Sequence, residues 1–354
     1  MKILLICDVP FHASGLSVMA ENTFNGLKAL GHEVEAQDLF NELEIERRLQ
    51  TEKYDVALGI GYWNDAVREI AIPKKYGVKS VVYWVSESNV PKYQDIIPEC
   101  DLLVTTSEFS REVFEHYVPA VADKIKVIYP GIDTEFYRPM PDIKPSPLFT
   151  TFVSSGEVKG CEEAIAAILI LSSNPPRDFK YIIHTPNIEY PLELEYYYRL
   201  KNIVKQLNLE KYITVVGGVK FPKSAMPRLY NTLYAFLAPI RMTCFSLPIL
   251  EAGACGVPTL AGDWKPLNEL VKDGETGLLF THLAKGILPK FMEGVWYTEE
   301  YRFADAADMA DKMRQILADE DLRNELGRKA RERVLENFDS KKQIKKLEEA
   351  INNV

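Results

Sequence analysis

The segment from 239 to 280 carries the residues with the clearest chemistry. A strand is predicted to end at Ile240, a loop of small and polar residues follows, and a helix is predicted from about Leu247. The first backbone N–H groups of a helix have no partner within the helix, and the helix dipole gives them partial positive charge. The N–H groups of Phe245, Ser246 and Leu247 are therefore suited to hold a diphosphate.

Glu251 lies about one turn into that predicted helix. A carboxylate there can accept two hydrogen bonds from a ribose diol, as acidic residues do in nucleotide-binding folds. The alternative is a solvated helix carboxylate, which the apolar neighbours Ile249, Leu250 and Ala252 disfavour. The pair of features predicts a nucleotide site.

A second candidate anion site lies in the loop before a helix predicted from about Ser17 to Leu30. Backbone N–H groups near Ser14 and Gly15 can receive a phosphate; a plain strand-to-helix turn is the alternative. The loop lacks the three glycines of the dinucleotide fingerprint, which disfavours a nicotinamide or flavin cofactor.

Strands that alternate with helices must position these residues. Short apolar runs predict strands at 2–8, from Val34, and at 55–61, 79–85, 101–107 and 124–130. The segment 138–147 has four prolines and is the predicted linker. Strands are then predicted at 149–155, 179–185, 212–218, 235–240 and 258–262. The pattern predicts an α/β protein with two doubly wound parallel sheets and ligands at the carboxyl ends of the strands.

Composition excludes several classes of protein. The 354 residues include 42 Lys+Arg and 51 Asp+Glu, a net charge of −9, which argues against binding nucleic acid by phosphate neutralisation. Residues 1–140 carry nearly all of that excess, a net of −8. No apolar window approaches the ~20 residues of a membrane span. Five cysteines without paired spacing predict neither disulfides nor a zinc site. The short apolar start is no signal peptide, so the cytoplasm is the expected compartment.

The segments LPILEAGACGVPTLA (247–261) and NELVKDGETGLLF (268–280) resemble the C-terminal signature of the retaining nucleotide-sugar glycosyltransferases of family four, which have the GT-B fold. Segments 27–36, 106–117, 125–139 and 229–239 agree with that family in order and spacing. The resemblance implies two Rossmann-like domains that face each other across a cleft. We expect the acceptor-side domain at 1–140, completed by a C-terminal helix at 340–354, and the donor-side domain at 148–338.

The resemblance implies that Glu251 binds the ribose. Close to Glu251, this sequence departs from the motif of the family. The family's first glutamate, which usually meets the donor sugar, falls on Thr243. The glycines around the family's phenylalanine are Cys244 and Ser246, with Phe245 kept. The backbone donors survive this change, but one carboxylate contact to the sugar does not.

A second departure concerns the donor diphosphate, which the family grips with an arginine and a lysine. Lys159 is kept, whereas Ser154 or Ser155 stands where the arginine is expected. Electrostatic clamping of a leaving diphosphate is the main catalytic effect in a metal-free site. Arg241 is a candidate to compensate.

A third departure lies after the strand 79–85, where the family's histidine near the reacting sugar falls on Ser86. Glu87 next to it is the candidate to contact the acceptor hydroxyl; a loop carboxylate in solvent is the alternative. Ser86, Glu87 and Lys159 are thus the candidate catalytic residues.

Further donor contacts follow two other predicted strand ends. His184 stands where the family often has glycines near the nucleobase, and Val219 and Lys220 stand where its backbone contacts the base. An ordinary strand-end residue is the alternative for His184. The segment 281–303 is longer than the family's usual connection, and we expect either a cap over the cleft or a surface hairpin.

The leading hypothesis is a metal-independent, retaining glycosyltransferase that uses a UDP- or GDP-type sugar donor, with no tightly bound cofactor. Ser14 and Gly15 would approach the phosphates from the first domain. The alternatives are a degenerate GT-B protein that binds nucleotide or glycan without catalysis, and another GT-B enzyme such as a nucleotide-sugar epimerase. The acidic segment 33–46 disfavours docking on an anionic membrane and favours a soluble, neutral or cationic glycan or small-molecule acceptor.

Overall fold

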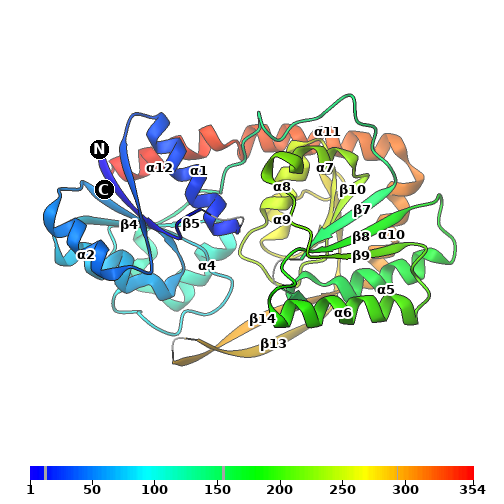
Figure 1. The fold of residues 1–354 in the computed structure, drawn as a ribbon, viewed down its shortest axis with the longest axis horizontal. Coiled ribbons are helices and arrows are strands. Elements are labelled where there is room, and N and C mark those ends of the chain that lie inside the picture. The colour runs from blue at the N-terminus through cyan, green and yellow to red at the C-terminus, as the bar shows by residue number, and fades with distance from the viewer. Residues whose placement is uncertain (12–13, 154–155, 293) are drawn as a thin grey trace. The chain divides into compact units, whose positions relative to one another are not determined.

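The computed structural model of the protein describes residues 1–354 apart from 12–13, 154–155 and 293. The chain divides into two compact units, each built on its own sheet (Figure 1). The first unit comprises Met1–Asp133, Leu288–Glu299 and Phe338–Val354. The second unit comprises Thr134–Ile287 and Glu300–Asn337.

The sheet of the first unit has six parallel strands in the order β2-β1-β3-β4-β5-β6. Its strands are β1 (Lys2–Cys7), β2 (Glu33–Asp38), β3 (Val56–Gly61), β4 (Lys79–Trp84), β5 (Leu102–Thr105) and β6 (Ile125–Val127). Its helices are α1 (Gly15–Ala29), α2 (Glu42–Thr51), α3 (Ile72–Lys75), α4 (Glu108–Tyr117) and α12 (Ser340–Asn352), with short turns η1 (Trp63–Asp65), η2 (Val67–Ala71), η3 (Ile97–Glu99) and η4 (Pro119–Lys124). Every residue of β3 is buried, as expected for a parallel strand covered on both faces.

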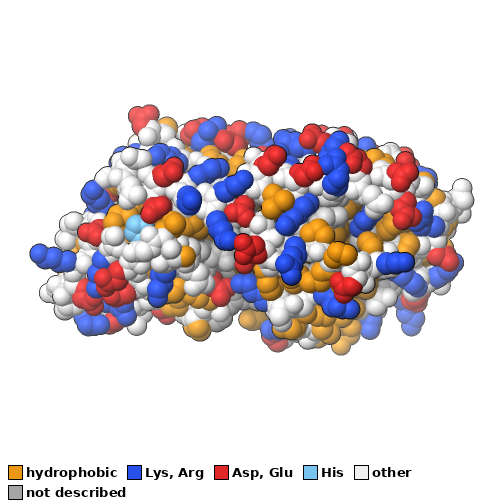
Figure 2. All heavy atoms as spheres, turned by 90° about the horizontal axis from the view of Figure 1, so that it is seen from above, with side chains coloured by type: hydrophobic (Ala, Val, Ile, Leu, Met, Phe, Trp, Pro, Cys, Tyr) orange, Lys and Arg blue, Asp and Glu red, His pale blue; other side chains and the backbone are white. Residues whose placement is uncertain are grey.

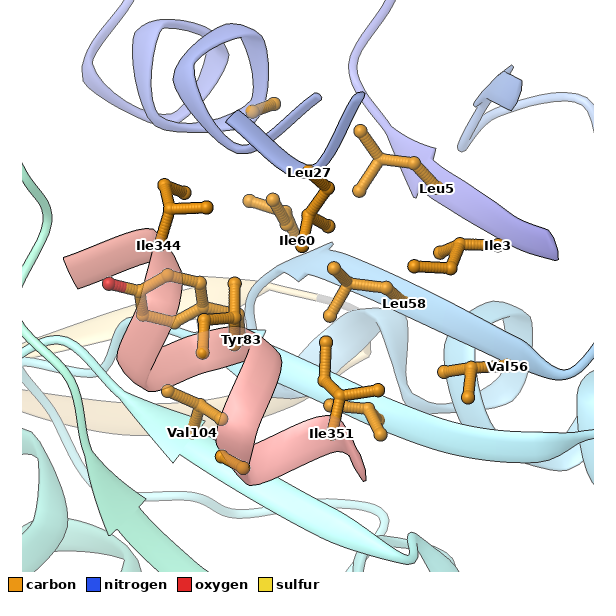
Figure 3. Close-up of a cluster of buried hydrophobic side chains, with 14 of the residues drawn as sticks. Ile3, Leu5, Leu27, Val56, Leu58, Ile60, Tyr83, Val104, Ile344 and Ile351 are labelled. Carbon is orange, nitrogen blue, oxygen red and sulfur yellow. The ribbon is translucent and has the colours of Figure 1, made fainter. Parts of the chain in front are cut away.

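The C-terminal helix α12 contributes to the core of the first unit (Figure 3). Its Ile344 and Ile351 point toward the side chains of Leu27, Tyr83 and Val104, which come from α1, β4 and β5. Each fully buried aliphatic side chain of this kind contributes about 2 kcal/mol. The core therefore joins segments from both ends of the sequence.

The second unit repeats the design with a parallel sheet in the order β12-β11-β10-β7-β8-β9. Its strands are β7 (Leu148–Phe152), β8 (Lys180–Thr185), β9 (Ile213–Gly217), β10 (Ala235–Ala238), β11 (Thr259–Gly262) and β12 (Gly277–Phe280). Its helices are α5 (Cys161–Ser172), α6 (Pro191–Gln206), α7 (Met226–Thr232), α8 (Leu247–Ala254), α9 (Leu267–Leu270), α10 (Ala306–Ala318) and α11 (Glu320–Asn337), with turns η5 (Gly156–Lys159) and η6 (Lys223–Ala225).

The boundaries of the two units differ from the domain boundaries predicted from the sequence. The proline-rich segment belongs to the second unit, because the Met140 N–H donates to Asn231 Oδ1 at 2.7 Å and the Ser146 N–H donates to the Thr232 carbonyl at 3.1 Å. These bonds tie the predicted linker to α7.

The strands β13 (His282–Met292) and β14 (Val295–Ala304) pair only with each other in the described sheets, as a two-stranded ribbon. Its residues 288–299 belong to the first unit. The Thr298 N–H donates to Asn89 Oδ1 at 2.9 Å, and Glu299 forms an antiparallel bridge with Ser88. The ribbon therefore packs on the loop that follows β4.

On the face shown in Figure 2, acidic and basic side chains are interspersed rather than separated into patches. None of the helices in the described ranges is both long enough and apolar enough to cross a membrane.

Candidate nucleotide site and acceptor loop

Four neighbouring strands of the second unit end at one edge of its sheet. Because β10, β7, β8 and β9 are adjacent and parallel, their carboxyl ends lie in a row. The predicted donor residues follow these ends: Lys159 after β7, His184 near the end of β8, Val219 and Lys220 after β9, and 243–251 after β10. Ligands of open α/β sheets bind at this edge.

Gly160 lets the Lys159 loop, which we define as residues 156–160, pass close to the end of β10. Its φ of +62° lies in the left-handed region, and a Cβ atom there would lie 1.9 Å from the Pro239 carbonyl oxygen. A glycine is therefore required at this position. The Arg241 N–H donates to the Val158 carbonyl at 2.8 Å and fixes the loop from the same side.

The guanidinium of Arg241 is buried in an ion-pair network. It makes a bidentate pair with Glu163 at 2.8 and 2.6 Å, and a third bond to Glu162 at 3.1 Å. Its Nη1 donates to the Glu157 carbonyl at 2.9 Å. Two carboxylates therefore neutralise Arg241, which holds the Lys159 loop in place rather than offering its charge to a diphosphate.

Glu251 is oriented by tyrosines. The Tyr230 hydroxyl donates to Glu251 Oε2 at 2.6 Å, and Tyr137 makes a further side-chain hydrogen bond to the carboxylate. Burial raises the pKa of Glu251, and both tyrosines oppose that shift by favouring the charged form. A carboxylate held in this way keeps acceptor sites for a ligand diol, because each oxygen has two lone pairs.

The loop before α8 is partly satisfied by its own residues. The Phe245 N–H donates to Thr243 Oγ1 at 3.3 Å, and the Thr243 hydroxyl donates back to the Phe245 carbonyl. Phe245 is therefore not the open donor that the sequence suggested. Ser246 is the buried N-cap residue, and its side chain makes no capping hydrogen bond. Cys244 is partly buried.

His184 is buried between aromatic rings. Its ring centroid lies 5.7 Å from that of Phe152 and 4.9 Å from that of Phe221. Burial lowers the pKa of His184, against a hydrogen bond with the backbone of Val219, so the imidazole is neutral at pH 7. Lys220 is exposed and paired with Glu189.

Ser86 is buried and uses its polar atoms locally. Its hydroxyl donates to the Ser88 carbonyl at 3.1 Å, and the Ser110 hydroxyl donates to the Ser86 carbonyl at 2.8 Å. These bonds fix the start of the loop after β4, residues 86–90, which we call the acceptor loop because the sequence predicts Glu87 as the residue that contacts the acceptor. The partly buried Glu87 lies near Tyr297; burial, followed by the charges of Glu299 and Glu87, raises the pKa of Tyr297 to about 12.

The helix α1 begins at Gly15, two residues earlier than expected. Ser14 caps it, because its Oγ accepts the Ser17 N–H at 3.2 Å. A side chain built on Gly15 would meet nothing within 4 Å. Ser154 and Ser155 lie outside the described residues. Within the described ranges, no three His, Cys, Asp or Glu side chains are grouped as a metal site.

Residues 133–285 match the model of the family described as glycosyl transferases group 1. Most of the second unit therefore resembles the group 1 glycosyltransferases. D-inositol 3-phosphate glycosyltransferase of Corynebacterium aurimucosum is 26% identical over 252 residues, which cover 67% of this chain and 53% of that protein. N-acetyl-alpha-D-glucosaminyl L-malate synthase of Bacillus anthracis is 32% identical over 146 residues, 41% of this chain and 32% of that protein. The chain therefore spans about half or less of the full length of these relatives.

Solved structures show the same fold over the whole chain. HepE of Anabaena, in complex with UDP, has a TM-score of 0.78 at 17% identity and is covered in full, as is this chain. Sucrose-phosphate synthase from Thermosynechococcus elongatus has a TM-score of 0.81 at 16% identity, with 100% of this chain and 98% of that chain covered. The protein is therefore an α/β protein of the GT-B fold, as predicted.

In the second unit, the sequence did not reveal the partners of the charged residues Glu251 and Arg241. Tyr230 lies in the segment 229–239, which agrees with the family in order and spacing. The positions of Tyr230 and Glu251 in the sequence did not show that the two residues are partners. The sequence also did not show that Glu163 pairs with Arg241, which lies 78 positions further along the chain.

Proposed function

We propose that the protein transfers a sugar from a nucleoside-diphosphate sugar to an acceptor hydroxyl, with retention at the anomeric carbon and without a metal ion. The observation that supports this best is the carboxylate of Glu251, which Tyr230 orients on α8 at the sheet edge that also carries the Lys159 loop. This is the arrangement that a ribose diol and a diphosphate require.

In the proposed donor site, Glu251 accepts hydrogen bonds from the ribose. Lys159 and the N–H groups of Ser246 and Leu247 meet the diphosphate, and His184 and Val219 lie toward the base. We propose a UDP-type donor, since structures of HepE from Anabaena hold UDP and UDP-glucose.

The proposed reaction breaks the bond between the anomeric carbon and the diphosphate oxygen, and the electron pair leaves with the diphosphate. Lys159 offsets that charge, which is the kind of electrostatic stabilisation that dominates such reactions. The acceptor oxygen forms the new bond to the anomeric carbon as its proton passes to the carboxylate of Glu87. In the first unit, Glu87 of the acceptor loop accepts the hydrogen bond of this hydroxyl, and Ser86 keeps the loop in place.

A thermal-shift series with UDP, GDP, ADP and their sugar conjugates tests the donor site. We expect stabilisation by UDP, and its loss in Glu251→Ala; the exposed Glu275→Ala is the matched control. Turnover of the best UDP-sugar is then measured with and without a chelator. Equal stabilisation of Glu251→Ala and the native protein would refute the site.

A second candidate function, nucleotide binding without catalysis, is favoured by one observation. Thr243 replaces the carboxylate expected at the donor sugar, and its hydroxyl is bonded to the backbone of Phe245. Stabilisation by UDP without release of sugar from any donor, over a panel of acceptors, would establish this alternative.

A further inference from the structure

Glu193, in the first turn of α6, lies against the Lys159 loop. The Gly156 N–H makes a hydrogen bond to its carboxylate, and Glu193 Oε1 lies 3.9 Å from the position of a Cβ atom on Gly156. Its other oxygen, Oε2, is buried and has no hydrogen-bond partner among the described residues. A backbone N–H of the loop proposed to hold a diphosphate is thus already bonded to a carboxyl group of the protein.

The loop is tied to α6 at a second point. Arg199 pairs with Glu157 of the loop at 2.6 Å and with Glu162 at 2.7 Å. The Tyr196 hydroxyl donates to Glu162 at 2.9 Å. The first three turns of α6 therefore hold the loop in the position in which Gly156 meets Glu193.

The charges favour an exchange of anions. Burial raises the pKa of the Glu193 carboxyl, whereas its hydrogen bond with Gly156 and the positive charge of Lys159 both favour the ionised form. A diphosphate bound to Lys159 would bring a second anion beside the same carboxylate. Like charges a few ångströms apart repel strongly where water is partly excluded.

We propose that Glu193 is an internal anion of the Lys159 loop, which the diphosphate of the donor displaces on binding. This inference rests on the proposed function, because it takes the Lys159 loop as the diphosphate site. It predicts that Glu193 weakens diphosphate binding, although it lies in the site. Part of the binding free energy is spent on releasing the carboxylate from Gly156 and from the field of Lys159.

The test is a double-mutant cycle with pyrophosphate and UDP as probes, measured by isothermal titration calorimetry. We expect Glu193→Gln to lower the Kd of both probes about tenfold, within the usual range of coupling between sites. In the Lys159→Met background the same substitution should change the Kd less than twofold. Glu195→Gln, on the exposed side of α6, is the matched control and should leave both Kd values unchanged.

Weaker or unchanged binding in Glu193→Gln, with native thermal unfolding, would overturn the inference; weaker binding would mean that the carboxylate contacts the ligand directly. The two probes separate this inference from the proposed function. If the Kd of pyrophosphate changes as expected while UDP does not bind, the role of Glu193 as an internal anion is supported and the proposed nucleotide site is refuted. If neither probe binds either protein, both fall.

Discussion

The hydroxyl of Tyr230 lies 2.6 Å from Oε2 of Glu251, and Tyr230 is fully buried. The tyrosine belongs to α7 and the glutamate to α8, so two helices of the second unit meet through one hydrogen bond to a charged group. Bonds of this kind contribute about 1.5–3 kcal/mol. The orientation of the proposed ribose-binding carboxylate therefore depends on a residue that does not itself need to touch the nucleotide.

Tyr230→Phe should weaken UDP binding about tenfold, because Glu251 loses the donor that sets its orientation. Calorimetric titration with UDP checks this. Tyr212→Phe is the control, since its hydroxyl makes only a long 3.5 Å bond to the Ser172 carbonyl. An unchanged Kd in Tyr230→Phe would show that Tyr137 alone is sufficient to orient the carboxylate.

Arg241→Ala should destabilise the protein by about 3–5 kcal/mol, because Glu163 would be left partly buried without its bidentate partner. The Lys159 loop loses one anchor on the same substitution, the bond from Arg241 Nη1 to the Glu157 carbonyl, whereas the backbone N–H of residue 241 still donates to the Val158 carbonyl. Urea denaturation measures the loss, and Arg314→Ala, which removes an exposed helix pair with Asp311, should have little effect. Similar midpoints for the two variants would contradict the role given to Arg241.

Gly160→Ala should disrupt the Lys159 loop more than its backbone conformation alone explains. Gly274 is the matched control, because its φ of +67° is similar but a side chain there would meet nothing within 4 Å. We expect Gly274→Ala to cost about 1 kcal/mol. Gly160→Ala should cost clearly more, since the new Cβ collides with the Pro239 carbonyl. Equal losses in thermal unfolding would mean that the backbone relaxes without difficulty.

Glu69 gives the first unit a dependence on pH. Its side chain is fully buried, Trp84 Nε1 donates to it, and burial, reinforced by the charge of Asp65, raises its pKa well above the usual 4.5. The folded state thus holds a proton that the unfolded state releases above pH 4.5, so this residue lowers the free energy of unfolding as pH rises from 4.5 toward the folded pKa.

Glu69→Gln should remove that contribution. Urea denaturation of both proteins between pH 5 and 8 provides the measurement, and the difference between the two profiles isolates Glu69 from other groups. We expect the variant to gain stability relative to the native protein as pH rises. Parallel profiles would show that Glu69 is already ionised in the fold.

The sequence predicted the elements better than the partnerships between them. Apolar runs and helix boundaries are local, so the strands of both sheets except β12, and the helix that carries Glu251, were found within a few residues. The bond from Tyr230 joins residues 21 positions apart, and the pair of Glu163 with Arg241 spans 78. Such pairs depend on which helices the fold brings together, and periodicity carries no information on that.

The ribbon was less predictable for a different reason. Large apolar residues such as Leu283, Phe291 and Trp296 remain mostly exposed on it. Apolar residues normally indicate that a strand is buried. Those of the ribbon are exposed, so they did not predict where the ribbon packs. Only the contacts of Thr298 and Glu299 with the acceptor loop show it.

The packing of α12 into the first unit has a consequence for biosynthesis. The six-stranded sheet of that unit is complete by residue 127, but Ile344 and Ile351 of its core leave the ribosome more than 200 residues later. The nascent first unit must wait with an uncovered apolar face while the whole second unit is made. Domains fold as they emerge, so the order of translation and the order of folding are reversed here: the unit synthesised first is finished last.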